Sequence, residues 1–118
     1  MGIEVDMENR SLGALGEDTA VQLMSAKGYT VIRRNYRCRF GEIDIIASRG
    51  NNLYFVEVKT RQGQAFGRPC EAVTPEKQRH IRKAAVFYLK EQKAAGYAMP
   101  RVHFQVIEIV IDHINDAF

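Results

Sequence analysis

The chain has 118 residues, of which 46% are apolar and 26% are charged, and this length and composition fit one globular domain with its own core. It contains no apolar run long enough to span a membrane and no secretion signal at its N-terminus, so we expect a cytoplasmic protein without a membrane partner. The two cysteines, Cys38 and Cys70, lack metal-ligand spacing and suit a reducing compartment.

The net charge of +3 is unevenly distributed along the chain. Residues 1–26 carry a net charge of −4, residues 27–101 carry +10 and residues 102–118 carry −3. The basic middle segment is rich in arginine, which binds phosphate groups better than lysine does. We therefore expect nucleic acid, most simply DNA, as the partner of this segment. The expected arginine contacts are Arg34, Arg37, Arg39, Arg61 and Arg68.

The first predicted element is a helix that follows a flexible N-terminus. Residues 1–10 show no periodicity, which leaves a single domain over residues 11–118. Ser11 is a suitable N-cap, and Gly28 is a suitable terminator for a helix that ends near Lys27. The helical neighbours of Glu17 are small or apolar, so this acid lies on a packing face or at its edge.

Three strands and a second helix should follow. Residues 29–35 read as a strand, and residues 41–47 and 53–59 read as two strands joined by a tight hairpin at Gly50-Asn51. After a long connection, Thr74-Pro75 caps a helix that runs to about residue 95. Residues 102–111 form the last strand. The order helix, three strands, helix, strand predicts an α/β fold whose mixed central sheet is flanked by helices.

Charged residues interrupt the two hairpin strands, where apolar residues would be expected. Burying an unpaired carboxylate costs several kcal/mol, so such residues are retained for a reason. The hairpin register places Asp44 opposite Glu57, and Glu42 opposite Lys59. Period-two alternation puts all four side chains at one corner of one sheet face.

Carboxylates that converge in this way require either raised pKa values or a cation. Mg²⁺ or Mn²⁺ prefers oxygen ligands, and Asp44 and Glu57 are the natural ones. Glu17 completes the set if its helix crosses the sheet at this corner. Lys59 would then hold a water or a phosphate, whereas Glu42 could simply pair with Lys59.

These residues resemble the PD-(D/E)xK nuclease superfamily, whose restriction-endonuclease-like core has the same order of elements. Asp44 and Glu57-Val58-Lys59 match its motif, although Ile43 stands in place of the proline. A more specific resemblance, to the YraN family of uncharacterised bacterial proteins, covers nearly the whole chain. The segments that carry it are Gly16-Glu17, Gly28-Tyr29, Arg34 to Arg37, Gly41 to Asp44, Phe55 to Arg61, Glu71 to Val73, and Lys77.

That family is similar to the archaeal Holliday junction resolvases. The similarity implies that Glu17, Asp44, Glu57 and Lys59 form a metal-dependent cleavage site, with Asp44, Glu57 and Glu17 as metal ligands. It also implies that Lys77 and Gln78 assist from the second helix as nucleic-acid contacts. A homodimer is compatible with the resemblance, but specificity for junctions does not carry over.

Three functions remain open from the sequence. The first is a metal-dependent endonuclease that acts on DNA, including branched or damaged DNA. The second is a nucleic-acid-binding module without cleavage, against which the pairing of Asp44 with Glu57 argues. The third is a protein-interaction factor whose acidic corner is a buried structural network, against which the uneven charge argues.

Overall fold

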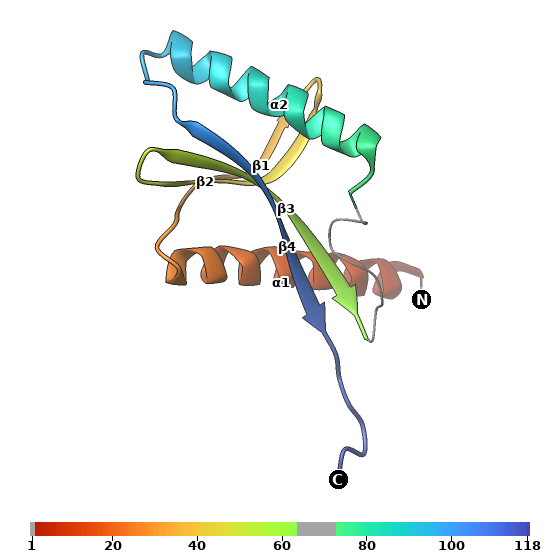
Figure 1. Cartoon of the computed structure of the whole chain (residues 1–118). Helices are drawn as coiled ribbons and strands as arrows, with labels where there is room; N and C mark the ends of the chain where they lie inside the picture. Colours follow the sequence, from red (N-terminus) through yellow and green to blue (C-terminus); the bar gives the residue numbers. More distant parts are fainter. Residues whose placement is uncertain (1, 64–72) are drawn as a thin grey trace.

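The computed structural model describes residues 2–63 and 73–118, and it has the predicted order of helices and strands (Figure 1). The elements are α1 (Gly2–Ala26), β1 (Thr30–Cys38), β2 (Gly41–Arg49), β3 (Asn52–Gln62), α2 (Pro75–Ala94) and β4 (Arg101–Ile111). The strands form one sheet in the order β1-β2-β3-β4, and only the β3–β4 pair is parallel. The fold is therefore mixed α/β. No helix of the described part of the chain is long and apolar enough to cross a membrane.

The hairpin between β2 and β3 confirms the predicted turn and register. Gly50 has a φ of 59°, the left-handed conformation that such a two-residue turn needs and that glycine adopts without steric cost. Arg49 pairs with Asn52, and the ladder continues in step to the pair of Ile45 and Val56. The turn thus fixes the register as far as Ile45 and Val56, and the ladder ends one residue before the predicted pair of Asp44 and Glu57.

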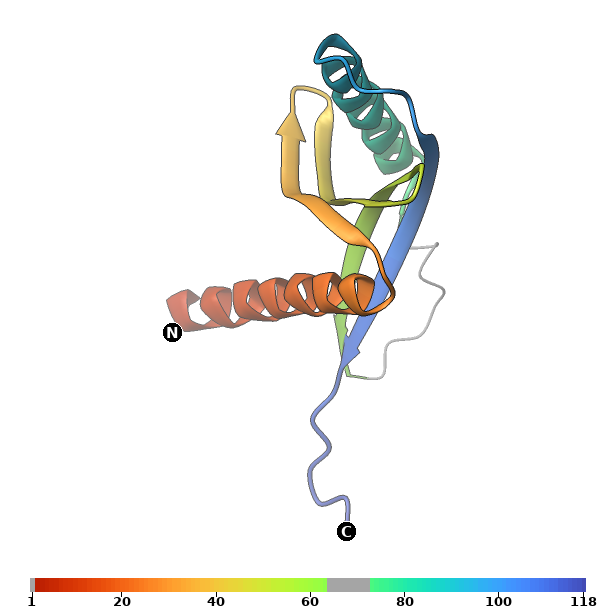
Figure 2. The same cartoon turned by 90° about the vertical axis from the view of Figure 1, so that its left-hand side faces the viewer.

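The two helices cover opposite faces of the sheet (Figures 1 and 2). On the face covered by α2, the buried cluster comprises Tyr36, Ile43, Ile46, Leu53, Phe55, Ala84, Ala85 and Tyr88. On the face covered by α1, it comprises Ala20, Met24, Ile45, Ala47, Tyr54 and Val56. Both sheet faces are apolar because both are covered, as the sequence predicted.

The first helix differs from its prediction in two ways. It begins at Gly2, so the N-cap predicted at Ser11 is wrong. An amphipathic helix would be expected to bury its leucines, yet Leu15 and Leu23 are exposed. The helix instead buries a narrow stripe of smaller side chains and one methionine, because it lies very close to the sheet. Flexibility of residues 1–10 stays a prediction.

This close approach is set by Gly16 of α1 and Thr60 of β3. A Cβ atom added at Gly16 would lie 1.9 Å from Oγ1 of Thr60 and 3.0 Å from its Cβ, far inside van der Waals contact. Ala20 and Met24, one and two turns further along, are 0% and 2% exposed. The absence of a side chain at Gly16 therefore lets the whole helix settle onto β3.

Strands β1 and β2 kink at the level of Asn35 and Asp44. These two residues have no partner in the β1–β2 ladder, which is also irregular between Val31 and Arg33, and Asn35 has a φ of 52°. Strict alternation along β2 would put Ile43 and Ile45 on one sheet face, but Ile43 packs on the α2 side and Ile45 on the α1 side. The kink reverses the alternation of side chains, and Figure 2 shows the resulting bend of the β1–β2 hairpin.

Replacing Gly16 should separate α1 from the sheet. We expect Gly16→Ala to lower the free energy of unfolding by about 2–3 kcal/mol, because the new methyl group collides with Thr60. Urea denaturation followed by circular dichroism measures the change. Gly13→Ala is the matched control, since a Cβ there meets nothing within 4 Å and alanine favours the helix by about 1 kcal/mol.

The double variant Gly16→Ala/Thr60→Ala should recover part of the loss, because it removes the nearest colliding atom. A Gly16→Ala protein as stable as the Gly13→Ala protein would contradict the close packing of α1 on β3.

Candidate metal and nucleic-acid site

Asp44 lies where β2 leaves β3. The regular ladder between these strands ends at the pair of Ile45 and Val56. One residue beyond, Oδ2 of Asp44 accepts a hydrogen bond of 2.8 Å from the backbone N–H of Val58. The carboxylate thus accepts a hydrogen bond from the Val58 N–H group, which would have bonded to the backbone of β2 if the ladder had continued. The same kink that turns β2 away from the sheet therefore holds Asp44 beside β3.

Glu57 is the buried member of the site, with 6% of its surface exposed. Its Oε1 atom forms an ion pair of 2.5 Å with Nζ of Lys77, which lies in the first turn of α2. That turn is held in place by Thr74, whose side chain accepts a hydrogen bond from the backbone N–H of Lys77, as the predicted cap requires. The first turn of α2 thereby supplies a positive charge that offsets the desolvation cost of burying the Glu57 carboxylate.

The two carboxylates open into a cleft of about 400 Å³ between the kinked hairpin and α2. Its lining includes Glu42, Asp44, Glu57, Glu76, Lys77 and His80. His80 and Glu76 were not predicted as site residues. No sequence motif marks these two residues, because they reach the cleft only through the packing of α2 against the hairpin.

Glu17 is not brought into this cleft. It lies on α1, against the opposite face of the sheet, where its Oε1 accepts a hydrogen bond of 3.1 Å from Nε of Arg34. Asp18 binds the same guanidinium group at 2.7 Å. Arg34 is thereby occupied by two acids of α1 and is placed away from the cleft.

Glu42 and Lys59 do not form the pair suggested by their register. Glu42 instead forms an ion pair of 3.4 Å with Arg37 on the adjacent strand. Alternation along β3 places Lys59 on the same face as Glu57, and Lys59 has no ion pair within residues 2–63 and 73–118. Its ammonium group thus has no counter-ion in the described part of the protein.

The other predicted nucleic-acid contacts are dispersed. Arg39 lies 4.7 Å above the ring of Phe40, and Arg61 is half-buried in an ion pair with Glu108. Gln78 donates a hydrogen bond of 2.9 Å to the backbone carbonyl of Val73. Arg68 lies outside the described residues. Lys77 lines the cleft and is paired with Glu57, whereas Arg37 lies beside the cleft through its ion pair with Glu42.

The donor set is compatible with a hard divalent cation. Asp44 and Glu57 line the same cleft, and both carry carboxylate oxygens that can act as metal ligands. Within the described residues, no group of three or more His, Cys, Asp and Glu side chains is already gathered around a cation-sized space. Mg²⁺ is commonly held by one or two carboxylates, with water and substrate phosphate completing its shell, so two carboxylates suffice.

Burial is the main cause of an unusual pKa at Asp44. The pKa of this carboxyl is raised from its ordinary value of 3.8 to about 6, chiefly by desolvation and in smaller part by the neighbouring Glu57. The hydrogen bond from Val58 and the charge of Lys77 act in the opposite direction. A second positive charge in the cleft would relieve the repulsion between Asp44 and Glu57.

Comparison with known proteins finds one family. The model of the uncharacterised protein family UPF0102 matches residues 16–109. A UPF0102 protein of Caldicellulosiruptor saccharolyticus is 44% identical over 110 residues, which cover 93% of this chain and 91% of that protein. A UPF0102 protein of Rhodococcus jostii is 45% identical over 118 residues, covering 93% of this chain and 98% of the relative.

The raised pKa of Asp44 predicts a pH-dependent loss of stability without metal. The folded protein holds this proton more tightly than the unfolded chain does. The stabilisation of the folded state that comes from protonated Asp44 is therefore fully present below pH 3.8 and is lost as the pH rises through about 6. At pH 7.5 in EDTA, Asp44→Asn should exceed the wild type in free energy of unfolding by about 1–2 kcal/mol, after allowance for solvent screening. At pH 4 the two should differ little.

Urea denaturation at both pH values measures this difference. Asparagine keeps an oxygen acceptor for Val58, whereas Asp44→Ala removes it and should destabilise the protein at both pH values. Glu42→Gln is the control acid in the same cleft. If Asp44→Asn instead loses about 2 kcal/mol or more at pH 7.5, the ionised carboxylate stabilises the fold and the interpretation is wrong.

Proposed function

We propose that this chain, which belongs to the uncharacterised protein family UPF0102, is a metal-dependent nuclease. Its site is the cleft between α2 and the point where β2 leaves β3. Membership confirms the predicted resemblance to the YraN family. The observation that carries the proposal is the convergence of Asp44 and buried Glu57 at one end of an open cleft. Two adjacent carboxylates have little structural use, since each raises the cost of burying the other.

The order of the elements and the position of the acids support grouping the fold with the restriction-endonuclease-like proteins. The acids lie on adjacent antiparallel strands, and Lys59 follows Glu57 by two residues on the same sheet face. A bound Mg²⁺ or Mn²⁺ supplies positive charge that polarises a phosphate and makes a nearby water more acidic.

The chain's own side chains have separate tasks in this proposal. Asp44 and Glu57 hold the cation, and Lys59 donates to phosphate oxygens as negative charge develops on them. Lys77 holds Glu57 in place before the cation binds, through their ion pair. Lys77 is 43% exposed, so its ammonium group is also accessible to a phosphate. Arg37 extends the basic surface at the rim of the cleft.

A nucleic-acid-binding module without cleavage is the second candidate. Two observations favour it: Glu57 is already neutralised by Lys77, and Glu17 is engaged by Arg34 on the other face of the sheet. In this case the cleft binds phosphate through Lys77 and Arg37, and the acids serve to orient them.

DNA cleavage assays distinguish the two candidates. The purified protein is incubated with linear, nicked and branched DNA in Mg²⁺ or Mn²⁺. We expect cleavage that falls at least about a hundredfold in Asp44→Asn and in Lys59→Ala, because each removes a group that acts on the reacting phosphate. Glu42→Gln, an acid of the same cleft that is paired with Arg37, should retain activity.

A second readout does not depend on cleavage. Mg²⁺ or Mn²⁺ should raise the melting temperature of the wild type but not that of Asp44→Asn, since a ligand that binds only the folded state stabilises it. DNA binding without cuts in either metal, together with no thermal shift, would leave the binding module. An absence of DNA binding at low salt would exclude both candidates.

A further inference from the structure

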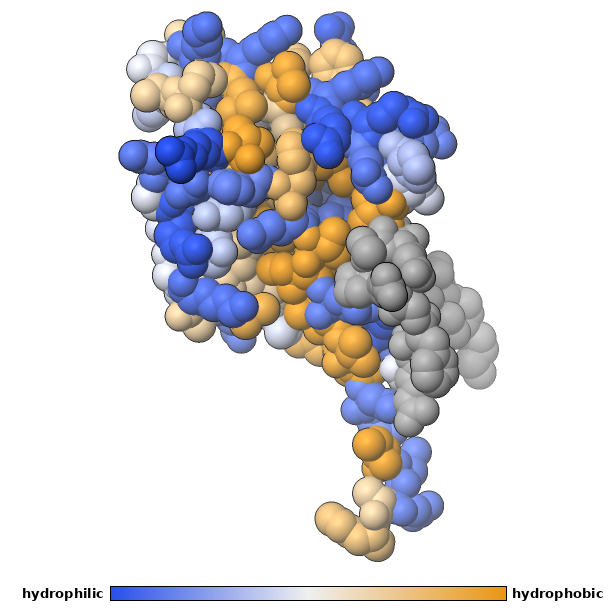
Figure 3. All heavy atoms as spheres, in the orientation of Figure 1, coloured by the Kyte–Doolittle hydropathy of each residue, from blue (hydrophilic) through white to orange (hydrophobic). Residues whose placement is uncertain are grey.

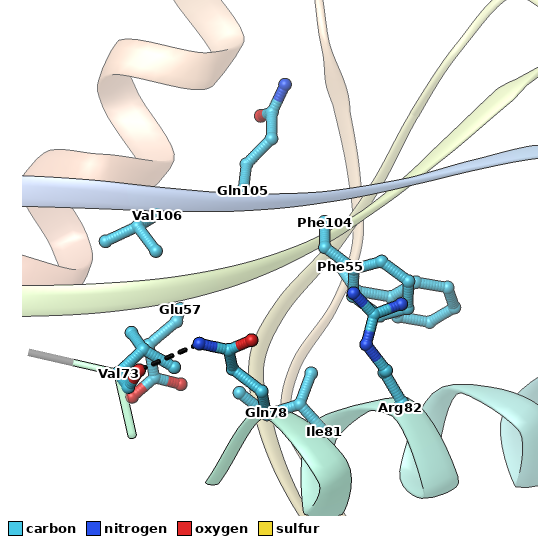
Figure 4. A pocket seen from close by; sticks show the side chains of 9 residues that line it. All are labelled: Phe55, Glu57, Val73, Gln78, Ile81, Arg82, Phe104, Gln105 and Val106. Atoms are coloured by element: carbon cyan, nitrogen blue, oxygen red, sulfur yellow. Dashed lines mark hydrogen bonds between the residues drawn. The ribbon is translucent and has the colours of Figure 1, made fainter. Parts of the chain in front are cut away.

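A second, smaller pocket adjoins the cleft on the other side of Glu57. It lies between α2 and β4, has a volume of about 140 Å³, and is mainly apolar (Figure 4). Its walls include Phe55, Val73, Ile81 and Val106, and Phe104 lies toward the surface with 41% of its area exposed. Glu57 and Ile81 line both hollows, so the pocket is a direct neighbour of the carboxylate cleft.

The size of the pocket limits what can occupy it. An engineered cavity of about 150 Å³ in another protein accepts a benzene ring. A volume of about 140 Å³ therefore suits one six-membered aromatic ring and is too small for a fused purine.

The rim of the pocket offers groups that recognise a nucleobase. The guanidinium group of Arg82 lies 4.8 Å from the centroid of the Phe104 ring, and this planar cation can stack on a base. The amide nitrogen of Gln78 donates to the carbonyl of Val73, which leaves the amide oxygen as an acceptor. Figure 4 shows this oxygen on the side of the amide that faces Phe104 and Arg82. It suits the N–H donors on the edge of a pyrimidine.

Charge around the pocket also suits a nucleic acid. The first half of α2 carries Lys77, Arg79, His80, Arg82 and Lys83, while Phe104 and the exposed Val102 lie on β4. Figure 3 shows hydrophobic residues in a band bordered by hydrophilic ones on this face of the molecule. Aromatic or apolar surface beside positive charge is the combination by which proteins hold unpaired bases and their phosphates.

From these observations we infer that the pocket holds an unpaired pyrimidine of the nucleotide next to the phosphate in the carboxylate cleft. The inference rests on the proposed function, because it assigns the substrate of the same site. A base in a duplex is stacked and cannot enter, so the substrate class is DNA with single-stranded character at the bound position, as at a branch, a flap or a damaged site.

Binding to short oligonucleotides in EDTA tests this without cleavage. Labelled oligomers of thymidine, cytidine, adenosine and an abasic backbone, of equal length, are titrated with the protein at low salt, and fluorescence anisotropy is recorded. The two pyrimidine oligomers should bind about tenfold more tightly than the abasic one, because the binding free energy of one inserted base should be similar to that of a base stacked on an aromatic side chain. The adenosine oligomer should bind close to the abasic level.

Two variants and one control identify the pocket as the cause. Val106→Phe fills the pocket and Phe104→Ala removes a wall, so both should lose the pyrimidine preference while keeping the abasic affinity. Val110→Ala, an exposed apolar residue of β4 outside the pocket lining, should keep the preference. Circular dichroism confirms that each variant is folded.

Equal binding of all four oligomers by the wild type would overturn the inference, as would a preference that survives Val106→Phe or an absence of any binding. The outcome is separable from the nuclease proposal. Pyrimidine preference in EDTA without cleavage in metal would exclude only the nuclease, and cleavage in metal without the preference would exclude only the pyrimidine pocket.

Discussion

The hydrogen bond between the Asp44 carboxylate and the backbone of Val58 is the contact on which the site depends. A four-stranded sheet that continued in regular register would leave no space between β2 and β3. The kink at Asn35 and Asp44 ends the ladder, and the exposed N–H group of Val58 then needs an acceptor. The Asp44 carboxylate is that acceptor, and Asp44 is also the residue at which β2 leaves β3. The cleft and one of its two acids are therefore products of the same local distortion.

The second acid, Glu57, is held by an ion pair and not by a backbone hydrogen bond. Glu57 is nearly inaccessible to water, and a buried carboxylate needs a nearby cation. Lys77 supplies that charge from the first turn of α2, whose direction is fixed by the Thr74 cap. The packing of α2 on the sheet through Ala84, Ala85 and Tyr88 thus positions a charge at the cleft. On the opposite face, the contact of Gly16 with Thr60 brings α1 down on β3 but directs Glu17 toward Arg34.

Much of this arrangement was predictable from local patterns. The hairpin turn at Gly50-Asn51, the pairing register, the cap of α2 and the order of the elements each follow from a few neighbouring residues. The partners of the charged side chains did not follow. Pairing in register suggested Glu42 with Lys59, yet Glu42 binds Arg37, because the kink changes where side chains beyond Ile45 point. His80 lacked any sequence signal as a cleft residue, since only the docking of α2 places it there.

The sequence by itself determined which residues alternate along β3, and hence that Glu57 and Lys59 share one face of the sheet. It also determined the register of β2 and β3 from Arg49 and Asn52 to Ile45 and Val56, because a tight turn admits one register, and Asp44 follows directly beyond that ladder. The tertiary structure decided that Lys77 is the counter-ion of Glu57, that Glu17 lies across the sheet, and that an aromatic-sized pocket adjoins the acids. The physical reason is that turns and alternation act over a few residues. Helix docking instead depends on side-chain volumes far apart in the chain, such as the missing side chain of Gly16.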